Sequence, residues 1–113
     1  MASLRRRLKT KAFQALFSSG FFIPGRHLSI IVKPKSSFDG GFGVALKKKK
    51  RNAVARNFLR RRLKEAFFLI QNQVSSRIDI IIIGTESIRT GTLAQIGQEI
   101  LYLLHKAHKK GYL

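Results

Sequence analysis

Residues 78–84 read IDIIIIG, and this run constrains the fold more than any other stretch of the chain. Isoleucine is branched at Cβ and favours extended backbone. The run does not alternate between apolar and polar residues, which indicates a central strand buried on both faces. The rest of the chain must therefore supply the layers that cover a buried strand.

Two further strands are expected before this run. In residues 27–33, HLSIIVK, alternate apolar side chains fall on one side of a strand. Residues 42–46, FGVAL, form a second apolar segment after a loop at 34–41 that contains Pro34, two serines and two glycines. The sequence PGR at 24–26 predicts a turn before the first of these strands.

Helices are expected at both ends of the chain. Residues 10–19 place Phe13, Leu16 and Phe17 on one face, and Gly20 is interpreted as a left-handed helix stop. Thr92 with Gln95 resembles a capping box, and an amphipathic helix follows it to a cationic end and a glycine stop in HKAHKKGYL. Its apolar stripe is Leu93, Ile96, Ile100, Leu103, Leu104 and Ala107.

The element order helix, strands, helix, strand, helix predicts an α/β (α+β) sandwich with helices packed on a small sheet. No repeat or linker divides residues 1–113, so a single domain is expected. No apolar run approaches the roughly 18 residues of a spanning helix. The first 25 residues are rich in arginine, as in a mitochondrial presequence, but a first helix of the domain is the favoured interpretation.

The charge of the chain indicates which kinds of partner it binds. The chain has 23 Lys and Arg against five acidic residues, a formal net charge of +18, and no cysteine. Charge of this size repels itself within a compact fold and attracts polyanions, with nucleic acid the first expectation and an anionic membrane surface the second. The absence of cysteine excludes disulfides and thiolate metal sites and fits a reducing compartment.

The positive charge is concentrated in residues 47–64, where ten of eighteen residues are Lys or Arg. Asn52 can cap a helix that runs to about residue 72. On a helical wheel its apolar stripe is Ala55, Leu59, Leu63, Ala66 and Ile70, with the Arg62 stem on the apolar side. A neighbouring sector holds Arg56, Asn57, Arg60, Arg61 and Lys64. Cations at a helix N-terminus and like charges four residues apart are both locally unfavourable, which favours a polyanion-binding site over a merely solvated face.

Residues 43–67, GVALKKKKRNAVARNFLRRRLKEAF, resemble the signature of the bacterial ribonuclease P protein subunit. The matching pairs are Lys48-Lys49, Ala53-Val54, Arg56-Asn57 and Arg60-Arg61, followed by Lys64-Glu65-Ala66-Phe67. AFQALFSSG resembles the first helix of that family, and DIIIIG falls where the family has the strand after its basic helix. The chain departs from the pattern at Phe58, where the family has a second arginine, at the very basic loop 47–51, and at Ile31, where an aromatic is frequent.

The resemblance implies a sandwich like the second domain of a small-subunit ribosomal protein, with a left-handed strand–helix–strand crossover where handedness rules favour a right-handed one. It also implies two binding surfaces. One would bind the catalytic RNA through Lys48, Lys49, Arg51, Arg56, Asn57, Arg60, Arg61 and Lys64. The other, a cleft between helix 10–19 and the sheet, would bind the single-stranded 5′ leader of precursor tRNA through Phe13, Phe17 and Arg26. Two Phe at this spacing are also typical of a core.

The family works in the cytoplasm beside an RNA that cuts the leader with Mg²⁺, so the expected partners are that RNA and precursor tRNA, with no membrane and no obligate protein partner. A catalytic role for the chain itself is not expected, because a two-metal site needs clustered carboxylates. The acids, Asp39, Glu65, Asp79, Glu86 and Glu99, are scattered. His105 and His108 could form an acid–base pair but fit a cationic helix end better, and His27 is interpreted as structural or as a minor contact. A ribosomal or general RNA-binding protein is the alternative.

Overall fold

The computed structural model describes residues 6–47 and 52–113 and is built on one four-stranded sheet. The strands are β1 (Phe21–Ile23), β2 (Leu28–Pro34), β3 (Phe42–Leu46) and β4 (Ile78–Gly84), in the spatial order β1-β2-β4-β3. Strand β2 pairs antiparallel with both β1 and β4, whereas β3 pairs parallel to β4. The predicted strand at 27–33 is shifted by one residue, and the other two have the predicted bounds.

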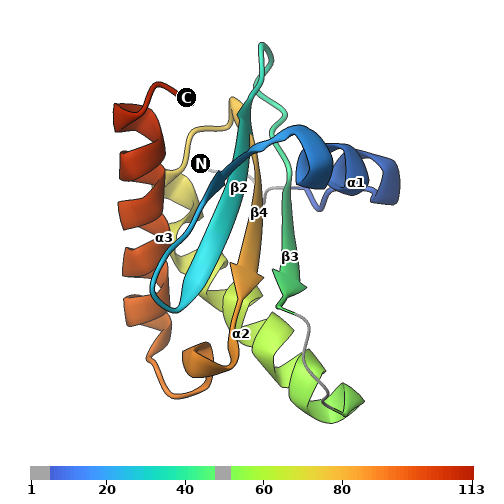
Figure 1. Ribbon diagram of the computed structural model, residues 1–113, viewed down its shortest axis with the longest axis vertical. Coiled ribbons are helices and arrows are strands. Elements are labelled where there is room, and N and C mark those ends of the chain that lie inside the picture. The colour runs from blue at the N-terminus through green and yellow to red at the C-terminus, as the bar shows by residue number, and fades with distance from the viewer. Residues whose placement is uncertain (1–5, 48–51) are drawn as a thin grey trace.

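Helices cover both faces of this sheet (Figure 1). Helix α1 (Thr10–Ser19) lies on one face, and α2 (Ala53–Ile70) and α3 (Leu93–Lys109) lie together on the other. Short 3₁₀ turns, η1 (Gln71–Gln73) and η2 (Glu86–Arg89), follow α2 and precede α3. The predicted α/β sandwich is therefore confirmed.

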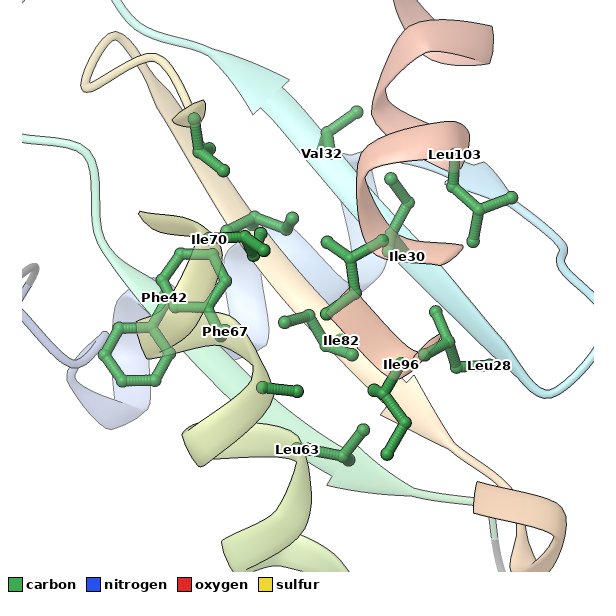
Figure 2. Packing of buried hydrophobic residues seen from close by; sticks show 14 of the residues in the cluster. Leu28, Ile30, Val32, Phe42, Leu63, Phe67, Ile70, Ile82, Ile96 and Leu103 are labelled. Carbon is green, nitrogen blue, oxygen red and sulfur yellow. The ribbon is translucent and has the colours of Figure 1, made fainter. Parts of the chain in front are cut away.

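Strand β4 is buried on both faces, as the isoleucine run predicts. Ile80 and Ile82 point into the main core beneath α2 and α3, whereas Ile81 packs with Leu16 of α1 on the opposite face. All three isoleucines have no exposed surface. Figure 2 shows Ile82 between Leu63 of α2 and Ile30 of the neighbouring strand. The double burial of one strand explains why it carries no alternation of polar residues.

The connection from β3 through α2 to β4 is a left-handed crossover (Figures 1 and 2). In a view from the face covered by α2, with both strands pointing upward, β3 lies to the right of β4. The chain therefore crosses from right to left as it passes from β3 through α2 to β4. Crossovers of this kind are right-handed in about 98% of cases, so this is a rare exception. The C-terminal half of α2 packs on β3 through Phe67 and Phe42, and the N-terminal end of the helix extends past the end of the sheet (Figure 1).

The predicted helix ends are largely confirmed. Asn52 Oδ1 accepts a hydrogen bond of 2.8 Å from the Ala55 amide, and Thr92 and Gln95 form both bonds of a capping box. Gly111, with φ at 79°, supplies the left-handed residue after α3. The basic helix ends at Ile70 instead of near residue 72, and the chain continues as η1.

Two details at the end of α1 differ from the sequence analysis. Gly20 is extended, with φ −76° and ψ 170°, so it is not a left-handed stop. A Cβ there would lie 2.5 Å from Ile31 Cγ2, so glycine is needed because α1 approaches β2 closely. Strand β1 follows at once and was not predicted, since its three residues are too few to show a period.

Candidate nucleic-acid interface

Helix α2 carries a stripe of apolar side chains on the side that faces the sheet and a row of cationic side chains on another side. Its predicted apolar stripe faces the sheet, with Ala55 half-buried and the other four residues buried. Phe67 joins them and stacks on Phe42 of β3 with the ring centroids 5.0 Å apart. Because the helix is fixed through this face, its other side is held in a defined orientation toward solvent.

That solvent side carries what we call the cationic ridge: Arg56, Asn57, Arg60, Arg61 and Lys64. Arg56, Asn57 and Arg61 are exposed, and Arg60 and Lys64 are half-buried. The structure therefore brings all five predicted residues onto one side of the helix. Lys48, Lys49 and Arg51 lie outside the described residues, so their part in RNA binding stays a prediction.

No ion pair between described residues neutralises the ridge. The ion pairs in the described part of the chain join Arg6, Lys35 and Arg89 to Asp39, Asp79 and Glu86. None of them involves a ridge residue, although internal pairing would have been the simplest structural explanation for these arginines. Their charge is available to an external anion.

Arg7 extends the ridge in a way the sequence did not indicate. Residues 6–8 run alongside the start of β3, where the Leu8 amide donates to the Phe42 carbonyl at 2.8 Å and the Phe42 amide donates to the Arg6 carbonyl at 3.0 Å. Burial lowers the pKa of Lys64, and the nearby positive charges of Arg7 and Arg60 lower this pKa further. Arg7 therefore lies close enough to Lys64 to share its electrostatic environment.

Arg62, in contrast, is a structural residue. Its Nε donates to the Ile88 carbonyl at 3.3 Å, and its Nη2 donates to the Gly91 carbonyl. The guanidinium thus binds the segment around η2 to α2, which agrees with the predicted position of its stem on the apolar side. We do not count it among the cations available to RNA.

A second surface lies on the face of the sheet opposite α2, and we call it the aromatic surface: Phe13, Phe17 and Phe22. Phe13 and Phe17 stack with centroids 6.1 Å apart and an interplanar angle of 22°. Phe17 is 52% exposed, whereas Phe13 is half-buried above Gly43 of β3, where a Cβ would approach its ring to 2.7 Å. Phe22 of β1 is 55% exposed and pairs with Ile31, so it lies on the same face and adds an aromatic that the sequence analysis missed.

Arg26 is not brought together with these rings. It lines a cavity of about 880 Å³ between the β1–β2 turn, η2 and α3, with Glu99 and Tyr102 among the lining residues. The residues that line it come from the β1–β2 turn, η2 and α3, and Figure 1 shows α3 away from α1. The grouping of Arg26 with Phe13 and Phe17 therefore finds no support in the geometry.

The acidic residues do not form a metal site in the part of the chain that is described. No group of three or more His, Asp or Glu residues there could hold an ion. The Lys35 ammonium lies 3.1 Å from Asp39 and 3.8 Å from Asp79, so a cation already lies beside these two carboxylates. A hydrogen bond from Ser37, and then one from Lys35, lower the pKa of Asp39.

The three histidines lie apart from the ridge. His27 Nδ1 is 2.9 Å from Ser87 Oγ, in a hydrogen-bonded turn. His105 and His108 are exposed and line a cavity of about 590 Å³ at the C-terminal end of α3. Neither location places a histidine beside the aromatic surface or the ridge.

Comparison with known proteins agrees with this geometry. The family model described as Ribonuclease P matches residues 1–108. The chain belongs to the ribonuclease P protein family. It is 32% identical to the ribonuclease P protein component of Gluconacetobacter diazotrophicus, with 98% of each sequence covered. It is 28% identical to that of Brevibacillus brevis, over 90% of this chain and 82% of the relative.

Solved structures of the family share the fold. The RNase P protein of Staphylococcus aureus is 25% identical, with a TM-score of 0.70 over 93% of this chain and 96% of that protein. The protein from Thermotoga maritima has a TM-score of 0.74 over 90% of this chain and 97% of that one, and at 20% identity it supports the fold alone. A ribonuclease P protein component is part of an endoribonuclease holoenzyme for tRNA processing. No described helix has both the length and the apolar character needed to cross a bilayer.

Proposed function

We propose that this chain binds the catalytic RNA of ribonuclease P through the cationic ridge and helps that RNA to remove the 5′ leader of precursor tRNA in the cytoplasm. The observation that carries the proposal is the ridge itself. Its four cations project from a helix whose other face is anchored in the core, and no described acid pairs with them. An RNA backbone supplies the missing counter-charge.

The chemistry of the ridge suits a structured RNA. Three of the four ridge cations are arginines, whose planar guanidinium can donate two parallel hydrogen bonds to one phosphate. Arg56, Arg60 and Lys64 follow one another at intervals of four residues, which corresponds to about 6 Å each along the helix axis. This spacing is close to that of successive phosphates along a nucleic-acid strand, so one strand can be contacted at several points.

The aromatic surface supports leader binding as the second part of the proposal. Phe17 presents an exposed ring beside Phe13, and stacking on aromatic side chains holds single-stranded bases whatever their sequence. Since α1 and α2 lie on opposite faces of the sheet, the leader and the catalytic RNA can be held at the same time. Binding the leader would favour precursor over mature tRNA.

Hydrolysis is assigned to the RNA and its Mg²⁺. The described carboxylates do not fit a magnesium site, because Lys35 lies between Asp39 and Asp79 and the other acids are dispersed. We therefore derive no chemical step from side chains of this chain. Its contribution is affinity and charge neutralisation, which Mg²⁺ would otherwise have to supply by screening.

Cleavage of precursor tRNA at low Mg²⁺ tests the proposal. A bacterial ribonuclease P RNA should process the precursor poorly by itself and well with this protein, and the protein alone should not cleave. A variant with Arg56, Arg60 and Arg61 changed to Gln should lose the stimulation. A matched variant with Arg77, Lys109 and Lys110 changed to Gln removes the same charge from exposed positions elsewhere and should keep it. Equal loss in both variants, or no stimulation by the unmodified chain, would contradict the proposal.

A further inference from the structure

An apolar pocket lies at the N-terminal end of α2, between that helix and η2. Its volume is about 370 Å³, enough for one nucleobase. Phe58 and Val54, one turn apart, are 42% and 79% exposed, so they present neighbouring apolar side chains to solvent. We call it the Phe58 pocket, and it is lined by Asn52, Val54, Ala55, Phe58, Leu59, Glu86 and Arg89.

The Phe58 ring is held from one side by Arg62. The guanidinium carbon of Arg62 lies 5.7 Å from the ring centroid, within the range of a cation–π interaction. Arg62 is itself fixed by its hydrogen bonds to the carbonyls of Ile88 and Gly91. The ring is therefore braced by a side chain that is not free to swing out to a ligand, and its remaining exposed surface belongs to the pocket.

Polar groups surround this apolar floor. Arg89 lines the pocket, and its side chain is 57% exposed, with its Nη1 3.3 Å from Glu86 Oε1. A pair this exposed contributes little to stability, so Arg89 can turn toward a phosphate at small cost. Asn52 uses its Oδ1 to cap α2, so the cap does not use its side-chain amide N–H groups.

From this arrangement we infer that the Phe58 pocket binds one unpaired base of the bound RNA, stacked on Phe58. Arg89 contacts the phosphate of the same nucleotide, and the Asn52 amide donates to an acceptor on the base. The inference rests on the proposed function and adds a base contact to the phosphate contacts of the ridge. Phe58 thereby confers a preference for RNA with an unstacked nucleotide at that point.

The surroundings favour a base over an apolar segment of a protein. Arg56 of the ridge is exposed on the same turns of α2, and Arg89 lines the pocket beside Glu86. An apolar floor with an exposed arginine at its edge matches a nucleotide, whose flat base is apolar on its faces and whose phosphate is anionic. A protein segment would have to desolvate these cations without a systematic source of negative charge.

Equilibrium binding of the ribonuclease P RNA, measured over a series of salt concentrations, tests the inference. Phe58→Ala should weaken binding by about 5- to 150-fold, the range measured for loss of one stacked base. It should leave the salt dependence of the affinity unchanged, because no charge is removed. Phe58→Tyr keeps an aromatic ring and should bind within about threefold of the unmodified chain, whereas Phe58→Leu keeps apolar bulk only and should lose affinity.

Phe38→Ala is the matched control. Phe38 is 74% exposed and lies beneath Arg77 at 5.2 Å, as Phe58 lies beneath Arg62, but it is in the β2–β3 loop at the other end of the sheet. If Phe58→Ala binds like Phe38→Ala, or Phe58→Leu binds like the unmodified chain, the stacking pocket is refuted while the proposed function stands. If the unmodified chain does not bind this RNA, both fail. Thermal unfolding of each variant shows whether it is folded.

Discussion

Neutralising Arg60 should change how the affinity for RNA depends on salt. Each phosphate contacted by a cation releases counterions, so the slope of log affinity against log salt falls by about 0.7–0.9 per contact. The ridge and Arg7 together present five described cations: Arg7, Arg56, Arg60, Arg61 and Lys64. If each contacts one phosphate, a fourfold rise in salt should weaken binding by about 130- to 500-fold through these contacts alone. Arg60→Gln should lower the magnitude of the slope by about 0.7–0.9, so its deficit relative to the unmodified chain shrinks by about threefold over that range.

The matched variant is Lys109→Gln, which removes one charge from the exposed end of α3. The two variants have the same net charge, so a purely global attraction would lower their affinities and slopes equally. The assay is a filter-binding or fluorescence titration of the ribonuclease P RNA at four or more salt concentrations. A slope for Arg60→Gln that is indistinguishable from that of Lys109→Gln would refute the assignment of the ridge as the contact surface.

Three further predictions concern other parts of the structure. Phe17→Ala should weaken binding of precursor tRNA to the holoenzyme by about 5- to 150-fold and leave mature tRNA unaffected; equal losses for both would argue against a leader contact. Leu63→Ala should lower the free energy of unfolding by about 2–5 kcal/mol, because Leu63 is fully buried between α2 and the sheet. Denaturant titrations measure this change, and a change below about 1 kcal/mol would mean that α2 is not anchored there. Burial and the charges of Arg7 and Arg60 lower the pKa of Lys64, so its ammonium should lose its proton, and with it a phosphate contact, at a lower pH than an exposed lysine does. The affinity for RNA should therefore begin to fall in that pH range, and Lys64→Gln should show a smaller decrease there; an unchanged profile would contradict this prediction.

The sequence predicts much of this fold because its signals are local. The isoleucine run, the cap at Asn52 and the box at Thr92 each act within a few residues, and the structure confirms them. A helical wheel of the basic helix likewise predicts which residues form the ridge, because helical periodicity determines which residues share a side. Element type and order follow from such patterns.

These local patterns do not predict which distant segments of the chain pair with each other. Strand β1 depends on pairing with β2, and the role of Gly20 depends on how closely α1 approaches Ile31. Arg7 joins the ridge only because residues 6–8 lie along β3. Arg26 was grouped with Phe13 and Phe17, yet the β1–β2 turn places it in a cavity lined by η2 and α3. Handedness of the crossover also has no local signal, and it came from the family resemblance alone.

The most direct test of the account is to map which RNA lies against α2. The chain has no cysteine, so Asn57→Cys and Gln98→Cys each create a single attachment point for an iron–EDTA group, one on the ridge and one on the exposed side of α3. In the complex with ribonuclease P RNA, hydroxyl radicals from residue 57 should cut a confined set of RNA positions, and those from residue 98 should cut these positions weakly or not at all. Strong cleavage from residue 98 with none from residue 57 would contradict the claim that the ridge contacts the RNA.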